Sequence, residues 1–116
     1  MLSVAHCDPA FARGFSGVKR IADYAALTRE PIACHSGPRS LVRFYTSVHL
    51  GGVVQKFFRV ENLIGEYRGF REQMALPGTE VVVRNSESVL PTSPGLGLQL
   101  NEDYVKAHTS KGEGWA

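Results

Sequence analysis

The sequence predicts one α/β domain with parallel strands. Three short apolar segments alternate with two stretches of helical periodicity, and a strand–helix–strand unit of about 30 residues places its two strands side by side in parallel. The chain has 116 residues, enough for one small domain. With 43% hydrophobic and 21% charged residues, its composition is that of a folded chain rather than a disordered one.

The first strand–helix–strand unit covers the first third of the chain. Residues 2–7 form a short apolar run that ends before Asp8, which favours a buried strand. Ser16 is a suitable N-cap for the helix that follows, and residues 32–34 form the second strand. The apolar residues of this helix recur at one-turn spacing and predict one buried face, made of Val18, Ile21, Ala22 and Ala25.

The pattern repeats once more and then breaks. A second amphipathic helix leads to a third strand at residues 57–60, and its apolar face is predicted from Leu41, Phe44, Tyr45 and Val48. We therefore assign residues 1–62 to alternating strands and helices, and residues 63–116 to a C-terminal extension.

The extension has weaker signals. Residues 63–78 lack clean periodicity and end in the turn signal Pro77-Gly78, and residues 81–83 predict a short strand. Asn101 is the expected N-cap of a short last helix. Beyond this helix we expect a frayed tail over residues 109–116.

Composition also limits the partners and the compartment. Thirteen Lys and Arg against eleven Asp and Glu leave a net charge of +2, which gives no reason to expect nucleic acid as a partner. The sequence has no apolar run of about 18 residues, so we expect no membrane span. Cys7 and Cys34 are too few for a disulfide framework, which predicts reduced thiols and a cytoplasmic location.

Three ionisable residues each follow a predicted strand directly: Asp8, His35 and Glu61. The carboxyl ends of parallel strands form the edge at which α/β proteins bind ligands and perform catalysis. Adjacent strands lie about 4.8 Å apart, so these side chains can meet. A carboxylate that accepts the Nδ1–H of an imidazole fixes its tautomer and leaves Nε2 free to move a proton. The pattern therefore predicts an acid–base site.

Structural interpretations stand beside this one. His35 can be a buried histidine that Asp8 satisfies, with no substrate nearby. No CxxC or HxxxH spacing supports a zinc site, and we interpret both cysteines as small core residues. The segment 94–97 (PGLG) lacks the phosphate-loop pattern and predicts a turn. We expect four basic residues on a solvated surface, namely Arg39, Arg43, Lys56 and Arg59.

Four segments together resemble the mandelate racemase branch of the enolase superfamily. Residues 8–22 (DPAFARGFSGVKRIA) are similar to the segment after the sixth strand of its TIM-type (β/α) barrel. Residues 31–38 (PIACHSGP) and 47–61 (SVHLGGVVQKFFRVE) look like the seventh-strand and eighth-strand segments. Residues 89–108 (VLPTSPGLGLQLNEDYVKAH) look like the tail that returns to the N-terminal capping domain.

The resemblance implies a role for each candidate residue. Asp8 and His35 would form an Asp–His dyad, in which His35 removes the proton α to a carboxylate or assists loss of a hydroxyl group. Glu61 would hydrogen-bond the substrate carboxylate as it becomes an enediolate. An Asp at position 8, rather than a Lys, favours the mandelate racemase branch over the muconate-cycloisomerase (muconate lactonizing) branch. The segment CHSGP is most similar to sugar-acid dehydratases of the galactonate dehydratase-like type, which are lyases of carbohydrate acid metabolism.

The resemblance also implies what lies outside this sequence. The ligands of the family's Mg²⁺ lie on earlier barrel strands, so the metal would be bound in the complete enzyme by residues that this chain lacks, and the extension would pack on a missing capping domain. Arg13 and Phe15 depart from the small residues that the family has there. We expect a C-terminal fragment, inactive alone, of an enzyme that forms a homo-oligomer at full length. The alternative is a small α/β binding or oligomerisation module without catalysis.

Overall fold

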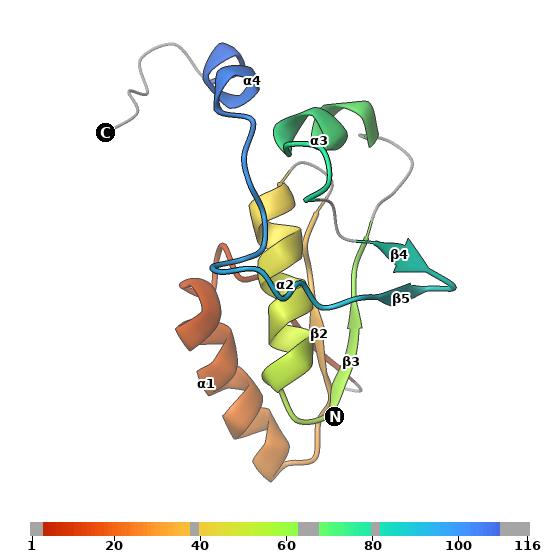
Figure 1. The fold of residues 1–116 in the computed structure, drawn as a ribbon. Coiled ribbons are helices and arrows are strands. Elements are labelled where there is room, and N and C mark those ends of the chain that lie inside the picture. The colour runs from red at the N-terminus through yellow and green to blue at the C-terminus, as the bar shows by residue number, and fades with distance from the viewer. Residues whose placement is uncertain (1–3, 38–39, 63–67, 80–81, 110–116) are drawn as a thin grey trace.

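The computed structural model describes residues 4–37, 40–62, 68–79 and 82–109. Strands and helices alternate in the first half, and a small hairpin and two short helices follow (Figure 1). In chain order the elements are β1 (Ala5–Cys7), α1 (Gly14–Leu27), β2 (Ile32–Cys34), α2 (Leu41–Val53), β3 (Phe57–Val60), α3 (Arg68–Met74), β4 (Val83–Arg84), β5 (Glu87–Ser88) and α4 (Glu102–Ala107). The structure therefore confirms an α/β fold with a parallel sheet.

The sheet has the order β1-β2-β3, and both pairs of strands are parallel. Cys7 pairs with Cys34, and Cys34 pairs with Val60, so the three strands end level with one another. The register shifts between β2 and β3, where Ile32 pairs with Phe57 but Ala33 pairs with Arg59. Phe58 is therefore the extra residue, as at a β-bulge.

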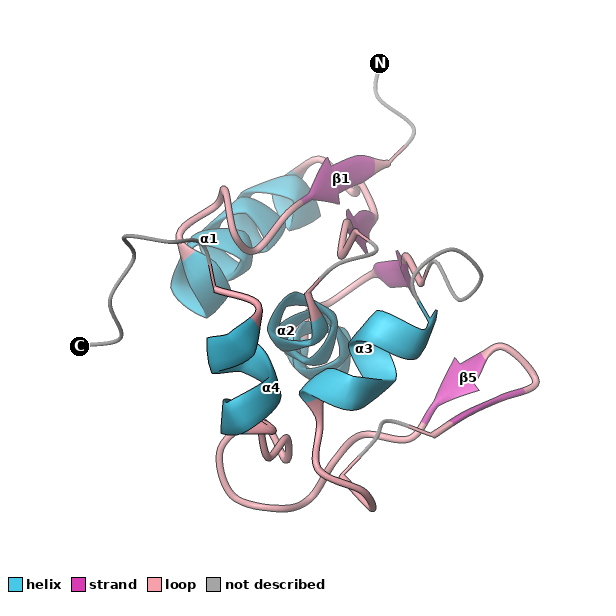
Figure 2. Cartoon of the chain, turned by 90° about the horizontal axis from the view of Figure 1, so that it is seen from above, coloured by secondary structure: helices cyan, strands magenta, loops and turns pink. Residues whose placement is uncertain are grey.

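One face of the sheet is covered by α1 and α2, which lie side by side (Figures 1 and 2). Alternate strand residues point toward these helices. Together they form the main apolar core, made of Cys7, Val18, Ala22, Ala25, Ile32, Cys34, Leu50 and Val54. The prediction that both cysteines are core residues is confirmed, and both thiols are free.

Two details of the predicted α1 were wrong. The helix begins at Gly14, and its N-cap is Arg13 in the left-handed conformation rather than Ser16. The chain already turns after β1, because the Gly14 N–H donates to the Pro9 carbonyl, so helical geometry starts earlier than the capping side chain suggested. Ile21 is 41% exposed, because α1 buries only the narrow stripe that faces the sheet and α2.

The extension contains elements that the sequence did not reveal. The helix α3 has only seven residues, too few for a periodic signal. The strand expected at residues 81–83 is a hairpin that starts at Val83, and its turn residues Asn85 and Ser86 both have positive φ, which suits a two-residue hairpin turn. Position 81 lies outside the described residues, as do residues 110–116 of the expected tail.

Other parts of the extension were predicted correctly. The Asn101 side chain accepts the N–H of Tyr104 and caps α4. A turn forms at Pro77-Gly78, where the Thr79 N–H donates to the Leu76 carbonyl.

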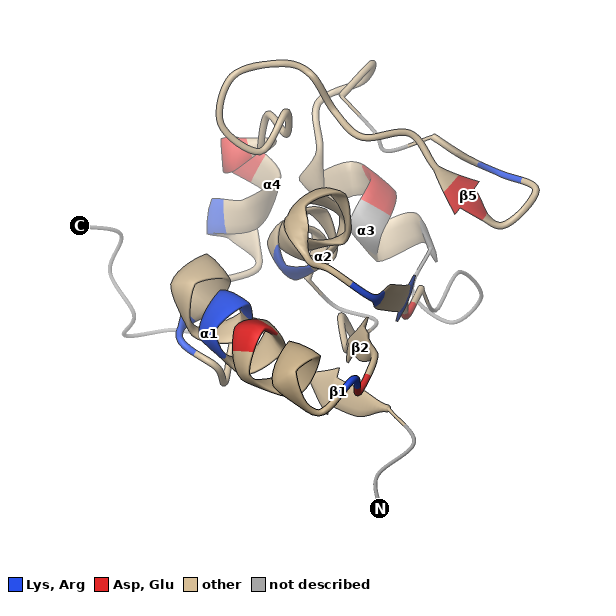
Figure 3. Ribbon diagram, turned by 90° about the horizontal axis from the view of Figure 1, so that it is seen from below, with Lys and Arg blue, Asp and Glu red and all other residues tan. Residues whose placement is uncertain are grey.

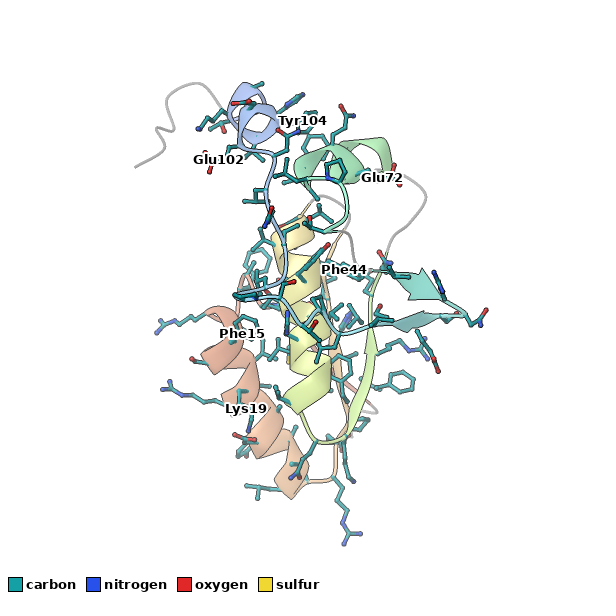
Figure 4. All side chains as sticks on the ribbon, viewed as in Figure 1. Phe15, Lys19, Phe44, Glu72, Glu102 and Tyr104 are labelled. Carbon is teal, nitrogen blue, oxygen red and sulfur yellow. The ribbon has the colours of Figure 1, made fainter. Side chains whose placement is uncertain are left out.

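The connector between the hairpin and α4 runs back along α2. Gly97 N–H donates to the Pro94 carbonyl, which confirms a turn at PGLG. The carbonyl of Leu96 accepts from Nε2 of His49 at 2.9 Å, and Ala75 bridges to Leu100. Beyond the bridge, α3 and α4 meet through aromatic rings, as the position of Tyr104 in Figure 4 shows. The extension is therefore held on the same helix that covers the sheet.

Charged residues are distributed over the helices and the hairpin (Figure 3). Among the helices of the described ranges, none is both long enough and apolar enough to cross a membrane.

We expect the isolated chain to self-associate through its sheet. Over the described residues, β1 and β3 each have a strand partner on one side only, and such edges pair with other chains. Phe58 on β3 is 52% exposed. Sedimentation velocity over a concentration series should show a rising average sedimentation coefficient, and Phe58→Lys should reduce that rise.

Leu27→Lys is the matched control, because Leu27 is 80% exposed but lies on α1 rather than on a strand. We expect it to associate like the wild-type chain. A monomer at every concentration, with cooperative thermal unfolding, would contradict association through the sheet.

Candidate functional site

The hydrogen-bond ladder of the sheet continues one step past the strands and aligns the three candidate residues. The backbone N–H of His35 donates to the Cys7 carbonyl at 2.8 Å. The N–H of Glu61 donates to the Cys34 carbonyl at 2.9 Å. Asp8, His35 and Glu61 therefore lie in a row along the carboxyl edge of the sheet.

The register shift at Phe58 is necessary for this row. In an unshifted ladder Cys34 would pair with Arg59, and His35 would stand opposite Val60. The extra residue in β3 instead brings Glu61 opposite His35. Side chains alternate along a strand, so Asp8 and His35 point away from Cys7 and Cys34.

Asp8 and His35 form a close pair. Nδ1 of His35 lies 2.6 Å from Oδ2 of Asp8. An ionised carboxylate can only accept, so Nδ1 carries the proton and donates it. The Asp8 side chain is 11% exposed and that of His35 is 41% exposed, so the acceptor is largely buried while the ring reaches solvent. The structure thus brings the two residues within the hydrogen-bond distance that the sequence predicted.

Glu61 completes the row on the other side of the ring. Its Oε2 lies 3.3 Å from Nε2 of His35, and this oxygen is buried without a hydrogen-bond partner among the described residues. A ring protonated on both nitrogens can donate to both carboxylates, whereas a neutral ring bonded to Asp8 leaves Glu61 unsatisfied. The arrangement suits a histidine that gains and loses a proton.

Asp8 stays ionised in this setting. Burial alone raises the pKa of the Asp8 carboxyl, but three groups outweigh that effect. They are the hydrogen bond from His35, the bond from the Ala10 N–H to Oδ1 at 2.8 Å, and the charge of Arg43. The pKa of Asp8 therefore lies below its usual value.

Arg43 is a residue of this candidate site that sequence reasoning missed. We expected it on a solvated surface, but its Nη1 lies 3.1 Å from Oδ2 of Asp8, and its side chain is 25% exposed. Arg43 lies in the first turn of α2, at the end of the helix that is close to the carboxyl edge of the sheet. One feature of the sequence could have indicated this contact: a basic residue in the first turn of the helix that follows the strand ending just before His35. Arg39 lies outside the described residues.

The two thiols beneath the row take no part in acid–base chemistry. Burial, together with the nearby Cys7 and Asp8 and against a hydrogen bond with Ser47, raises the pKa of Cys34 to about 11. Burial also raises the pKa of Cys7. Both thiols are therefore neutral near pH 7.

The fold and the edge define an α/β domain with a row of Asp, His and Glu at the carboxyl ends of its parallel strands. Over residues 1–104 the sequence matches the family described as enolase C-terminal domain-like, and the chain belongs to that family. No curated protein matches the chain, and no solved structure matches it either. The match confirms the superfamily, whose members are enzymes of the lyase and racemase type, whereas the galactonate dehydratase-like branch stays a prediction.

Members of this superfamily generally bind Mg²⁺, but the residues of this row do not fit that ion. Mg²⁺ takes about six oxygen ligands in near-octahedral geometry. Both oxygens of Asp8 already accept hydrogen bonds, and Oε2 of Glu61 faces a ring nitrogen. Across the residues that the structure describes, no group of three His, Cys, Asp or Glu side chains is placed to hold a metal.

The low pKa of Asp8 makes part of the stability depend on pH. Because the folded pKa lies below the unfolded value of about 3.9, this contribution is complete above that value and is lost as the pH falls through the folded pKa. We expect Asp8→Asn to lower the free energy of unfolding by about 1 kcal/mol at pH 7. The difference between the two proteins should shrink below about pH 3.5.

Urea unfolding at pH 7 and pH 3 measures this difference, at a single protein concentration because association also stabilises the folded chain. Asp23→Asn is the control, since Asp23 forms only an exposed pair with Lys19. An equal difference between wild type and Asp8→Asn at both pH values would contradict the lowered pKa.

Proposed function

We propose that this chain supplies the proton-transferring part of the active site of an enolase-superfamily enzyme, a sugar-acid dehydratase or racemase. The observation that carries the proposal is the half-exposed His35 ring, held by Asp8 at Nδ1 and facing Glu61 at Nε2. Membership of the enolase C-terminal domain-like family supports the reaction class. The dehydratase assignment rests on the resemblance of the CHSGP segment alone.

Proton abstraction is the first step. Nε2 of His35 takes the proton from the carbon α to the substrate carboxylate, and the electron pair of the C–H bond moves into the carboxylate, which becomes an enediolate. The ring becomes an imidazolium, which the buried negative charge of Asp8 stabilises. The hydrogen bond at Nδ1 also keeps the ring oriented, so that Nε2 is the atom that receives the proton.

Two outcomes follow from the enediolate. In a racemase a proton returns to the α-carbon on the opposite face. In a dehydratase the hydroxyl group on the next carbon leaves with a proton from the imidazolium as water, and the resulting enol becomes a 2-keto acid. In either reaction the Glu61 carboxyl hydrogen-bonds the substrate carboxylate as it becomes an enediolate.

The row provides only part of what this chemistry needs. An enediolate carries two units of negative charge, and the described part of the chain offers it Glu61 and the imidazolium. We therefore propose that the active site is completed by other barrel strands, which also hold the Mg²⁺, and that the full protein is a homo-oligomer. On this proposal the 116-residue chain is inactive alone.

Exchange of the substrate α-proton for deuterium tests the proposal. The protein should be expressed in its longest in-frame form and, in parallel, as residues 1–116, and each incubated in D₂O with Mg²⁺ and a panel of six-carbon sugar acids. We expect exchange, seen by proton NMR, in the longer form only. His35→Asn should abolish it, and Asp8→Asn should slow it by roughly 10²–10⁴-fold.

His49→Asn is the matched control, because His49 lies on α2 and its ring bonds to the Leu96 carbonyl, away from the row. Its rate of exchange should equal that of wild type. If His35→Asn loses thermal stability but keeps the exchange, His35 is structural and the proposal is wrong. Absence of exchange in both forms of the wild-type protein would instead favour the alternative, a binding or oligomerisation module without catalysis.

A further inference from the structure

Arg43 contacts the same carboxylate oxygen as the proposed base. Its Nη1 lies 3.1 Å from Oδ2 of Asp8, the oxygen that also accepts from Nδ1 of His35. The start of α2 puts it there, because Ser40 caps the helix by accepting the Arg43 N–H at 3.2 Å. The first turn of α2 therefore faces the carboxyl edge of the sheet.

The guanidinium lies in a space shaped for it. Gly37 has a φ of +61°, and a Cβ added there would lie 3.1 Å from Nη1 of Arg43. The ring of Phe11 lies 5.8 Å from the guanidinium carbon, within the range of a cation–π contact. Two loops thus surround Arg43, the loop after β1 and the loop after β2.

Three hydrogen-bond donors reach the Asp8 carboxylate and fix its orientation. Oδ1 accepts from the Ala10 N–H, and Oδ2 accepts from His35 and Arg43. The carboxylate has few other charged neighbours. Glu61 and the His6 ring lie against His35 rather than Asp8, and the neutral thiol of Cys34 lies on the other face of the sheet. Arg43 is the cation in direct contact with Asp8 among the described residues.

We propose that Arg43 is a positioning residue for the proposed dyad: it keeps Asp8 ionised and turned so that Oδ2 receives the Nδ1–H of His35. A buried carboxylate that loses its cationic donor would hold a proton more readily, and a protonated, neutral Asp8 would stabilise the His35 imidazolium less. Arg43 thereby acts on catalysis through Asp8 and not on the substrate. The catalytic consequence rests on the proposed function, whereas the effect on Asp8 does not.

Titration of the Asp8 carboxyl by carbon-13 NMR tests the inference. Arg43→Gln removes the charge but keeps a polar side chain, and we expect the midpoint of the Asp8 titration to rise by roughly one pH unit. Arg43→Lys should restore most of the shift. Arg20→Gln is the matched control, since Arg20 is exposed on α1, and its Asp8 midpoint should equal that of wild type.

Gly37→Ala gives a second route to the same result, because the added Cβ displaces the guanidinium while the charge stays in the chain. It should also raise the Asp8 midpoint. In the α-proton exchange assay, Arg43→Gln should lower kcat roughly 10-fold or more with little change in KM, and the acid limb of the pH profile should move to higher pH.

Unchanged Asp8 midpoints in both Arg43→Gln and Gly37→Ala would overturn the inference, whatever the activity. A raised midpoint in a protein whose wild type shows no α-proton exchange would support the positioning role and contradict the proposed function instead. The two ideas therefore fail through different measurements.

Discussion

The parallel ladder between β1, β2 and β3 is the constraint on which the rest of this structure depends. Its last two hydrogen bonds, at the backbone N–H groups of His35 and Glu61, set the relative height of three side chains that are far apart in sequence. The helices that cover one face of the sheet also fix the direction of these side chains. Cys7 and Cys34, which directly precede Asp8 and His35, are packed in the core under the helices, so the side chains that follow them point the other way. A shift of one residue in any strand would separate the row.

The alternation of strands and helices, and the residues at the strand ends, could be predicted because they follow from local periodicity and from the sequence position of each strand end. The alignment of Glu61 could not, because it depends on an extra residue at Phe58, and periodicity does not reveal a register shift. Arg43 was missed because its partner is Asp8, 35 positions away and on another element. The helix α3 and the hairpin around Asn85 are too short for a periodic pattern of apolar residues to predict them.

The row combines a buried acid with an exposed base. Asp8 is enclosed by the loop after β1, by Arg43 and by the ring of His35, and these contacts keep its charge despite burial. The His35 side chain is 41% exposed, and its second nitrogen faces Glu61 at the edge of the sheet. This difference in exposure matches a division of labour in which Asp8 orients and His35 transfers the proton.

The tautomer of the His35 ring tests the central claim most directly, because it reports the Asp8 contact without reference to any substrate. Nitrogen-15 NMR of the ring, at a pH where it is neutral, distinguishes a proton on Nδ1 from one on Nε2. The geometry predicts the Nδ1–H tautomer, with Nε2 free to accept a proton. A ring that carries its proton on Nε2 would contradict the dyad and the acid–base role built on it.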